Sequence, residues 1–376
     1  MNILDNTERI NELDPAGQLN WIEQWKKMFF ESYCNGKSII IPDNVALGKD
    51  VNLDYSKKIS SVVFAGMGGS AISGDYTTVL LSVLKFNRPS FIIRGYELPS
   101  WINKTTLIIL ISYSGNTRET CMCLFQALKK QSLVICLSSG GLMKKVAQKY
   151  SLPWIQLPSG YQPRAAFPIL FATILGVMRK TFDLKQIDHQ IQGLDVKLSA
   201  IWEFNGINVK TENNTAKKLA LKLLNKIPVI VTTESPLGMR WKGQINENAK
   251  MIAMYDIFPE NMHNSIQGWE NSKVKDLFFI ILKLGFNTSE ITDKMVYSLK
   301  IAQEEDPITP EILEFDNGTE LSDLMTATYF GDIVSLYLAF LQEIDPSVIR
   351  LISGMKKHFG SILDEEFDVE KALMNF

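Results

Sequence analysis

One stretch decides the fold: residues 61–75 read SVVFAGMGGSAISGD. Its first part, residues 61–65, is short, apolar and rich in β-branched side chains, which is typical of a buried strand. Residues 66–70 form a glycine turn, and apolar residues then recur at helical spacing up to Val83. The order of strand, glycine turn and helix predicts the start of an α/β unit with a parallel sheet.

The same pattern recurs along the chain. Further apolar strands are expected at residues 91–93, 106–111, 133–137, 154–157, 228–232, 250–256, 277–284 and 313–315. Helical patterns alternate with them, including residues 164–180, 237–249, 321–343 and 346–358. We therefore predict an α/β protein with two doubly wound parallel-sheet domains in tandem. The expected parts are a helical lead-in (1–40), a first domain (41–190) and a second domain with C-terminal helices (191–376).

The composition of the chain argues against several classes of function. Of 376 residues, 46% are hydrophobic and 21% are charged, which is typical of a folded globular chain. The formal net charge of -2 gives no indication of a nucleic-acid partner. The four cysteines and three histidines include no CxxC or HxxxH pair, so we expect no metal site.

The chain also gives no membrane or export signal. Its first residues are partly acidic, without the apolar run of a secretory signal. The most apolar stretches, residues 167–178 and 277–284, are shorter than the roughly 20 residues that span a bilayer. We expect a cytoplasmic protein with reduced thiols and no membrane partner.

The turn at Gly66–Ala71 fits the relaxed dinucleotide fingerprint G-x-G-x-x-A. That fingerprint requires an acidic residue about 20 positions later, and residues 84–88 contain none. Backbone N–H groups at the start of a helix also bind phosphate without such a residue. The turn therefore favours a phosphate or sugar-phosphate site built on Gly68, Gly69 and Ser70, with a purely structural turn as the main alternative and a dinucleotide site as the weakest one.

A second candidate turn, Ser112–Thr117, reads SYSGNT and follows an apolar strand. Ligands of open α/β sheets bind beyond the carboxyl ends of the strands. A helix cap needs one hydroxyl, whereas this turn offers Ser112, Ser114 and Thr117. The surplus predicts phosphate binding by hydroxyl and N–H groups without a lysine.

Residues 66–75 and 112–120 resemble the sugar isomerase (SIS) domain. Four more segments narrow the resemblance: PRAAFP (163–168), RWKGQINENAK (240–250), MHN (262–264), and DP (345–346) with the Ile349, Ile352, Met355 and Lys356 that follow. In order and spacing they resemble the bifunctional phosphoglucose/phosphomannose isomerase family, from about residue 40 to about residue 358. This resemblance implies two SIS-type, flavodoxin-like domains with the active site in the cleft between them. It also implies a homodimer and no metal or organic cofactor.

The resemblance implies an aldose–ketose isomerisation of hexose 6-phosphates. Moving a proton between adjacent carbons needs a base, and the cis-enediolate intermediate needs a nearby cation. Glu247 matches the proton-transferring carboxylate and Arg164 the cation. His263 and Lys356 match the pair associated with opening the sugar ring. Ser70, Ser112, Ser114 and Thr117 match the anchors of the sugar phosphate.

The segment after His263 departs from the family. The usual sequence is Asn-Glu-Ile-Val-Gly, and here Ser265 and Gln267 replace the glutamate and the valine. Loss of a carboxylate beside the imidazole predicts slower ring opening and leaves the preferred hexose epimer open.

We keep two alternatives. The first is a non-catalytic sugar-phosphate sensor, which would need the anchors and could lose Glu247. The second is another sugar-phosphate isomerase, or an amino-sugar enzyme, on the same fold.

Overall fold

A computed structural model describes residues 2–48, 51–269, 276–301, 309–355, 358 and 367–376. The chain forms two compact units that interleave in sequence. Unit 1 comprises residues 1–26 and 189–349, and unit 2 comprises residues 27–188 and 350–376. Each unit is an α/β structure built on a parallel sheet, as predicted.

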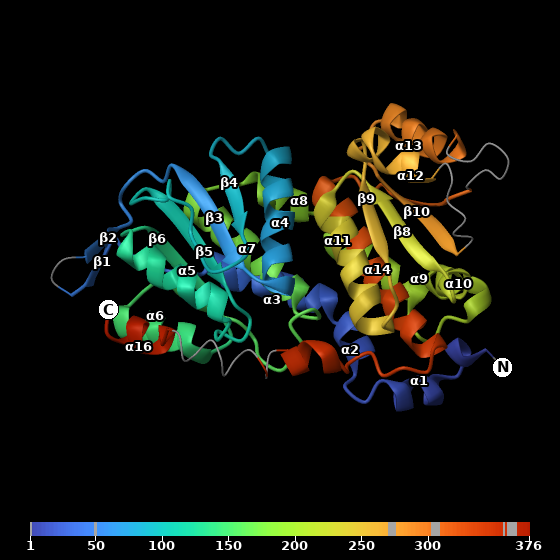
Figure 1. The fold of residues 1–376 in the computed structure, drawn as a ribbon, viewed down its shortest axis with the longest axis horizontal. Helices are drawn as coiled ribbons and strands as arrows, with labels where there is room; N and C mark the ends of the chain where they lie inside the picture. The colour runs from blue at the N-terminus through green and yellow to red at the C-terminus, as the bar shows by residue number, and fades with distance from the viewer. Residues whose placement is uncertain (1, 49–50, 270–275, 302–308, 356–357, 359–366) are drawn as a thin grey trace. The chain divides into compact units, whose positions relative to one another are not determined.

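Unit 2 contains a five-stranded sheet in the order β4-β3-β5-β6-β7. Every neighbouring pair is parallel, and the three central strands are buried along their whole length because helices cover both faces. The strands are β3 (Ser61–Gly66), β4 (Ser90–Ile93), β5 (Thr106–Ile111), β6 (Leu133–Ser138) and β7 (Trp154–Gln156). The helices are α3 (Trp25–Lys37), α4 (Gly68–Val83), α5 (Arg118–Lys129), α6 (Gly141–Tyr150), α7 (Phe167–Phe182) and α16 (Val369–Met374) (Figure 1).

Strand register brings the carboxyl ends of β3, β5 and β6 to one edge of this sheet. Gly66 pairs with Ile111, and Ile111 pairs with Leu137. The chain moves from β3 to β4 on one side and returns to β5 on the other, so the strand order reverses between β3 and β5. Such a switch point is where doubly wound sheets bind ligands.

Unit 1 repeats this topology with one strand fewer. Its parallel sheet has the order β11-β10-β8-β9. The strands are β8 (Ile227–Thr232), β9 (Met254–Ile257), β10 (Leu277–Leu284) and β11 (Glu311–Phe315). The helices include α1 (Thr7–Leu13), α2 (Gln18–Glu23), α9 (Leu194–Asn205), α10 (Thr215–Leu223), α11 (Ser235–Gln244), α12 (Ser265–Trp269), α13 (Ser289–Ile301) and α14 (Glu320–Leu341).

Helix α14 is the core helix of unit 1. By length and composition it could cross a membrane, but 94% of its apolar window is buried inside the protein. Gly331 lets α14 pack closely against α11, since a Cβ at this position would lie 2.3 Å from the Trp241 ring. The helix therefore buries its apolar surface against protein.

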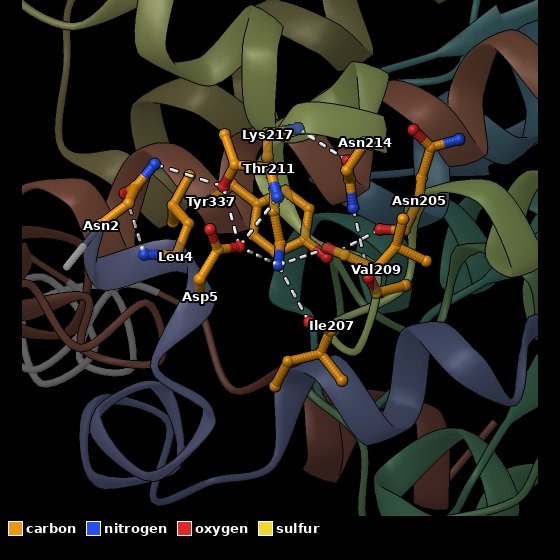
Figure 2. Close-up of polar contacts among 11 residues, drawn as sticks. Asn2, Leu4, Asp5, Asn205, Ile207, Val209, Thr211, Asn214, Lys217 and Tyr337 are labelled. Atoms are coloured by element: carbon orange, nitrogen blue, oxygen red, sulfur yellow. Dashed lines mark hydrogen bonds and ion pairs between the residues drawn. The ribbon is translucent and has the colours of Figure 1, made fainter.

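A buried lysine fixes the N-terminal segment to unit 1. Lys217 of α10 is fully buried, and its Nζ donates to the carbonyls of Ile207 and Val209 at 2.9 and 2.7 Å (Figure 2). The same group lies 3.3 Å from the carboxylate of Asp5, which also accepts from the N–H of Thr211 at 2.8 Å. A buried ammonium needs such a complete set of partners, so these contacts hold residues 1–26 in this unit.

Several predicted element bounds are wrong. The helix predicted at 237–249 ends at Gln244 and continues as a π-helical turn, Ile245–Ala249. The strand predicted at 250–256 begins only at Met254. The helical lead-in predicted for residues 1–40 contains α1, α2 and α3, and the region around the predicted boundary at residue 190 contains α8 (Gln186–Ile191) and α9. An antiparallel strand pair, β1 (Asn44–Leu47) with β2 (Val51–Asp54), was not predicted.

The division into units differs from the predicted linear domains. The break between the halves lies at Asp188–His189, next to the predicted residue 190. Residues 1–26 pack within unit 1, and residues 350–376 are assigned to unit 2 rather than to the second domain. That residues 41–190 and 191–376 fold as separate domains stays a prediction.

Candidate active site

The first glycine turn joins β3 to α4 in unit 2. Gly68 has φ of +50°, and nothing lies within 4 Å of the position that a Cβ would take there. Gly69 is tightly packed instead, because its Cβ would lie 2.8 Å from the carbonyl oxygen of Pro163 and 3.6 Å from the Cα of Arg164. Gly68 therefore offers open backbone to a ligand, and Gly69 brings the Arg164 segment against this turn.

The second turn is organised around the Ser112 hydroxyl. This oxygen accepts from the N–H groups of Gly115 (3.1 Å) and Thr117 (3.3 Å), and the hydroxyl donates to Thr117 Oγ1 at 2.9 Å. A serine hydroxyl has one donor and two acceptor positions, so all three are used. Ser112 is buried, whereas Ser114 is exposed and Thr117 half-buried. Ser112 thus shapes the turn, and Ser114 and Thr117 lie where a ligand can reach them.

One hydrogen bond joins the two turns across the switch point. The N–H of Tyr113 donates to Oγ of the buried Ser70 at 3.4 Å. Helices α4 and α5 begin from these two turns, so their unpaired N–H groups lie at the same edge of the sheet. Helix N-termini with nearby hydroxyls bind phosphate readily.

Arg164 belongs to the same side of unit 2. It lies between β7 and α7, and only 5% of it is exposed. A buried arginine keeps its charge, so it provides positive charge in a region of low dielectric constant. Its backbone contact with Gly69 brings it to the first turn.

Three residues support the turns although the sequence predicted no role for them: Tyr113, Asn116 and Ser139. Tyr113 OH donates to the Pro158 carbonyl at 2.9 Å and accepts from the N–H of Tyr161 at 3.0 Å, which ties the second turn to the loop before Arg164. Asn116 Oδ1 accepts from the N–H of Leu142 (2.8 Å), and Ser139 Oγ donates to the Tyr113 carbonyl (2.7 Å). The only sequence signal was a polar cluster after each of two neighbouring strands.

Glu247 lies in unit 1 on the π-helical turn after α11. The turn is fixed to α14, because Asn248 Nδ2 donates to Ser335 Oγ at 2.9 Å. About two turns before Asn248, the buried guanidinium of Arg240 pairs with Asp332 at 2.5 Å. Ile245, Asn248 and Ala249 are buried while Glu247 is half-exposed. Glu247 is therefore the charged, partly exposed residue of this turn, and π-helical turns of this kind are frequent at functional sites.

His263 ends the 3₁₀ turn Glu260–His263, beyond β9 in unit 1. It is exposed, and none of the described residues hydrogen-bonds its ring. Ser265, which stands where the family has glutamate, donates its hydroxyl to Asn264 Oδ1 at 3.0 Å. The Ser265 side chain is therefore engaged with its neighbour.

The structure brings together part of the predicted set. Within unit 2 it gathers Gly68, Gly69, Ser70, Ser112, Ser114, Thr117 and Arg164 at or beside two linked turns. Glu247 and His263 belong to unit 1, and Lys356 lies outside the described residues. The described part of the chain contains no group of three or more His, Cys, Asp or Glu residues placed to hold a metal ion.

Comparisons with known proteins agree with this architecture. Residues 212–359 match the family model described as bacterial phospho-glucose isomerase C-terminal SIS domain. In fold, the chain is similar to a glucose-6-phosphate isomerase-like protein from Thermus thermophilus, with a TM-score of 0.59 and 17% identity over 95% of this chain and 99% of that one. A D-glucosamine-6-phosphate 4-epimerase from Sulfolobus acidocaldarius is 24% identical over 92% of this chain and 98% of its own length.

One relative is similar enough to assign the family of this chain. A bifunctional phosphoglucose/phosphomannose isomerase from Caldicellulosiruptor bescii is 35% identical over 331 residues, which cover 85% of this chain and 95% of the relative. Identity at this level over nearly the whole relative goes beyond a shared fold. The chain therefore belongs to the bifunctional phosphoglucose/phosphomannose isomerase family.

Proposed function

We propose that this protein interconverts hexose 6-phosphates, converting glucose 6-phosphate or mannose 6-phosphate to fructose 6-phosphate and back. The observation that carries the proposal is the pair of linked turns in unit 2, where two helix N-termini and accessible hydroxyls meet at a switch point. Membership of the family supports the same reaction.

The phosphate group binds at the two turns. Ser114 and Thr117 donate hydroxyl hydrogen bonds, and the backbone near Gly68 approaches the phosphate because no side chain intervenes. Ser112 and Ser70 hold the two turns in register. Binding energy from this non-reacting group orients the reacting carbons.

Glu247 transfers the proton. Its carboxylate takes the proton from C2 of the open-chain aldose, and the C2–H electron pair forms the C1–C2 double bond of the cis-enediolate. A proton moves from O2 to O1, and return of the carbon-bound proton to C1 gives the ketose, so no oxidant or reductant is needed. The guanidinium of Arg164 stabilises the negative charge of the enediolate.

His263 and Lys356 serve ring opening. His263 is exposed, so its imidazole is accessible to a cyclic sugar and can exchange a proton with it, as ring opening requires. We also propose that the protein acts as a cytoplasmic homodimer in glycolysis or gluconeogenesis, in keeping with the family resemblance. The proposed chemistry uses no metal or organic cofactor.

A coupled assay tests the function. The protein is incubated with each aldose 6-phosphate in the presence of a chelator, and fructose 6-phosphate formation is measured. Turnover of either aldose supports the proposal. Tight binding of both without turnover would instead support the sensor alternative.

One relative favours a second reaction. The similarity to a D-glucosamine-6-phosphate 4-epimerase covers nearly the whole chain, so a sugar-phosphate epimerase is the competing enzyme. Carbon NMR of the product separates the two reactions. A ketose signal supports isomerisation, whereas inversion at C4 without a ketose would contradict it.

A further inference from the structure

A separate cavity lies at the end of the unit 2 sheet where the strands begin, opposite the end that bears the two turns. It has a volume of about 410 Å³, within the range of roughly 300–1,000 Å³ that is usual for small-molecule sites. Leu107 and Ile135, near the amino ends of β5 and β6, form part of its floor. The proposed phosphate turns follow the carboxyl end of β5, and a six-residue strand is about 20 Å long. This cavity is therefore distinct from the candidate active site.

The cavity is strongly cationic. Lys57, Lys58, Arg88 and Lys180 line it, and no aspartate or glutamate of the described chain is among its lining residues. Lys57 pairs with Asp54 at 3.5 Å, but Lys58 and Lys180 are exposed and form no ion pair with any described residue. Four cations around one cavity, in a chain of net charge -2, create a local positive potential. Such a potential selects a ligand with several negative charges.

Arg88 is held in place before any ligand arrives. Its Nε donates to the Ile59 carbonyl at 2.9 Å, and its guanidinium lies over the rings of Phe86 and Phe182 at 5.5 and 5.0 Å. A fixed guanidinium loses little conformational entropy when it binds an anion.

The remaining walls are apolar and offer few polar partners. Ile41, Ile59 and Phe182 are half-buried at the cavity, so each leaves apolar surface uncovered. Tyr55 presents its ring, since its hydroxyl already donates to the Val134 carbonyl at 2.7 Å. No Asp, Glu, Asn or Gln of the described residues lines the cavity, so the hydroxyls of a sugar phosphate would find few side-chain acceptors.

One buried hydroxyl at this cavity has no partner. Thr181 Oγ1 is buried and makes no hydrogen bond, although buried polar atoms nearly always make one. Thr181 is one of the lining residues, and because its hydroxyl oxygen is buried, the cationic and apolar side chains, not this hydroxyl, make the contacts with a ligand.

We propose that this cavity binds a small molecule that joins phosphate groups to an aromatic ring system, as a nucleoside diphosphate does. The cations bind the phosphates, and the half-buried apolar side chains cover the ring. A hexose phosphate lacks the aromatic ring and would leave the apolar walls uncovered.

Titration calorimetry of the full chain with ADP tests the proposal. Saturating fructose 6-phosphate is present throughout, so that the phosphate turns of the active site are occupied. We expect one ADP per chain, and weaker binding of inorganic pyrophosphate, which has the charge without the ring. The proposal would be overturned if ADP does not bind in the presence of fructose 6-phosphate. It would also be overturned if pyrophosphate binds at least as tightly as ADP.

Charge-reversal variants locate the site. Lys58→Glu with Lys180→Glu should weaken ADP binding at least tenfold, since two cations become anions. Lys218→Glu makes the same type of change at an exposed lysine of α10 in unit 1 and should alter binding less than twofold. Melting temperatures of the variants check folding. Equal ADP affinity in the double variant and the parent would show that the cavity is not the site.

Discussion

Ser112 and Ser114 lie two residues apart in one turn and have different roles. Ser112 uses both acceptor positions and its donor inside the turn, whereas Ser114 is exposed. Sequence analysis placed both among the phosphate anchors because a sequence shows hydroxyls and not their partners. Burial and hydrogen bonding separate a residue that shapes the site from one that a ligand can contact.

This difference predicts two distinct variants. Ser114→Ala should weaken hexose phosphate binding by about 1–3 kcal/mol, the cost of a lost hydrogen bond to a charged group, with an unchanged melting temperature. Ser112→Ala removes the acceptor of the half-buried Thr117 N–H, while the Gly115 N–H keeps its bond to the Ser112 carbonyl at 3.0 Å. This loss should lower the free energy of unfolding by about 1–3 kcal/mol. Calorimetry and urea unfolding of both variants measure the effects. The assignment fails for a Ser114→Ala variant with parental affinity.

His263→Ala should impair ring opening without loss of stability. The side chain is exposed, so its removal creates no cavity and should leave the melting temperature unchanged. Turnover of cyclic glucose 6-phosphate should fall more than turnover of a shorter aldose phosphate that cannot close a pyranose ring. His189→Ala, at another exposed histidine, is the matched control. Equal losses of kcat/KM on both substrates would argue against a ring-opening role.

At the scale of elements, sequence analysis predicted the strands better than the segment that carries Glu247. Buried strands such as β5 and β6 are continuous apolar runs, which the sequence shows directly. The π-helical turn depends on contacts between Asn248 and Ser335 and between Arg240 and Asp332, which join positions about 90 residues apart. Local periodicity cannot reveal such distant partners, so the segment was predicted as a plain helix.

Ser335→Ala should affect catalysis through the position of Glu247. It removes the acceptor of the buried Asn248 amide, so the π-helical turn loses one of its hydrogen bonds to α14. We expect kcat to fall about tenfold, an increase of about 1.4 kcal/mol in the barrier, with little change in KM. Ser298→Ala, which removes a buried serine hydroxyl bonded within α13, is the control. A parental kcat in Ser335→Ala would show that this contact does not position the carboxylate.

Asp323 of α14 should give unit 1 a pH-dependent stability. Burial raises the pKa of this carboxyl to about 6, and the nearby Asp316 acts in the same direction against the hydrogen bond from the Asn317 N–H. The folded state therefore holds a proton that the unfolded state releases near pH 4, so this group's contribution to stability decreases as pH rises from about 4 to 6.

Asp323→Asn tests this expectation. Relative to the parent, the variant should gain stability as pH rises through that window, because its amide keeps the acceptor oxygen and does not ionise. Asp293→Asn, at an exposed aspartate of α13, controls for net charge. Urea unfolding at a series of pH values provides the comparison, and parallel stability curves for Asp323→Asn and the parent would contradict the assignment.

At the scale of the whole molecule, the sequence predicted two doubly wound parallel sheets, and the structure confirms the fold class. It could not show how the two units share the chain. Helix α16 packs on α5 and α6 of unit 2, where Tyr150 OH donates to the Leu373 carbonyl at 3.0 Å. Likewise Lys217 binds Asp5 and so fixes the N-terminal segment to unit 1. Neither segment has a sequence pattern that indicates which distant residues it contacts.

The central claim is that Glu247 moves a proton between C2 and C1, and isotope exchange tests it most directly. The protein is incubated with glucose 6-phosphate in D₂O, and deuterium at C2 of the recovered aldose is measured by NMR. The parent should incorporate deuterium, whereas Glu247→Gln should lose exchange and turnover by roughly 10²–10⁴-fold while still binding sugar phosphate. Deuterium incorporation at the parental rate in Glu247→Gln would contradict the account.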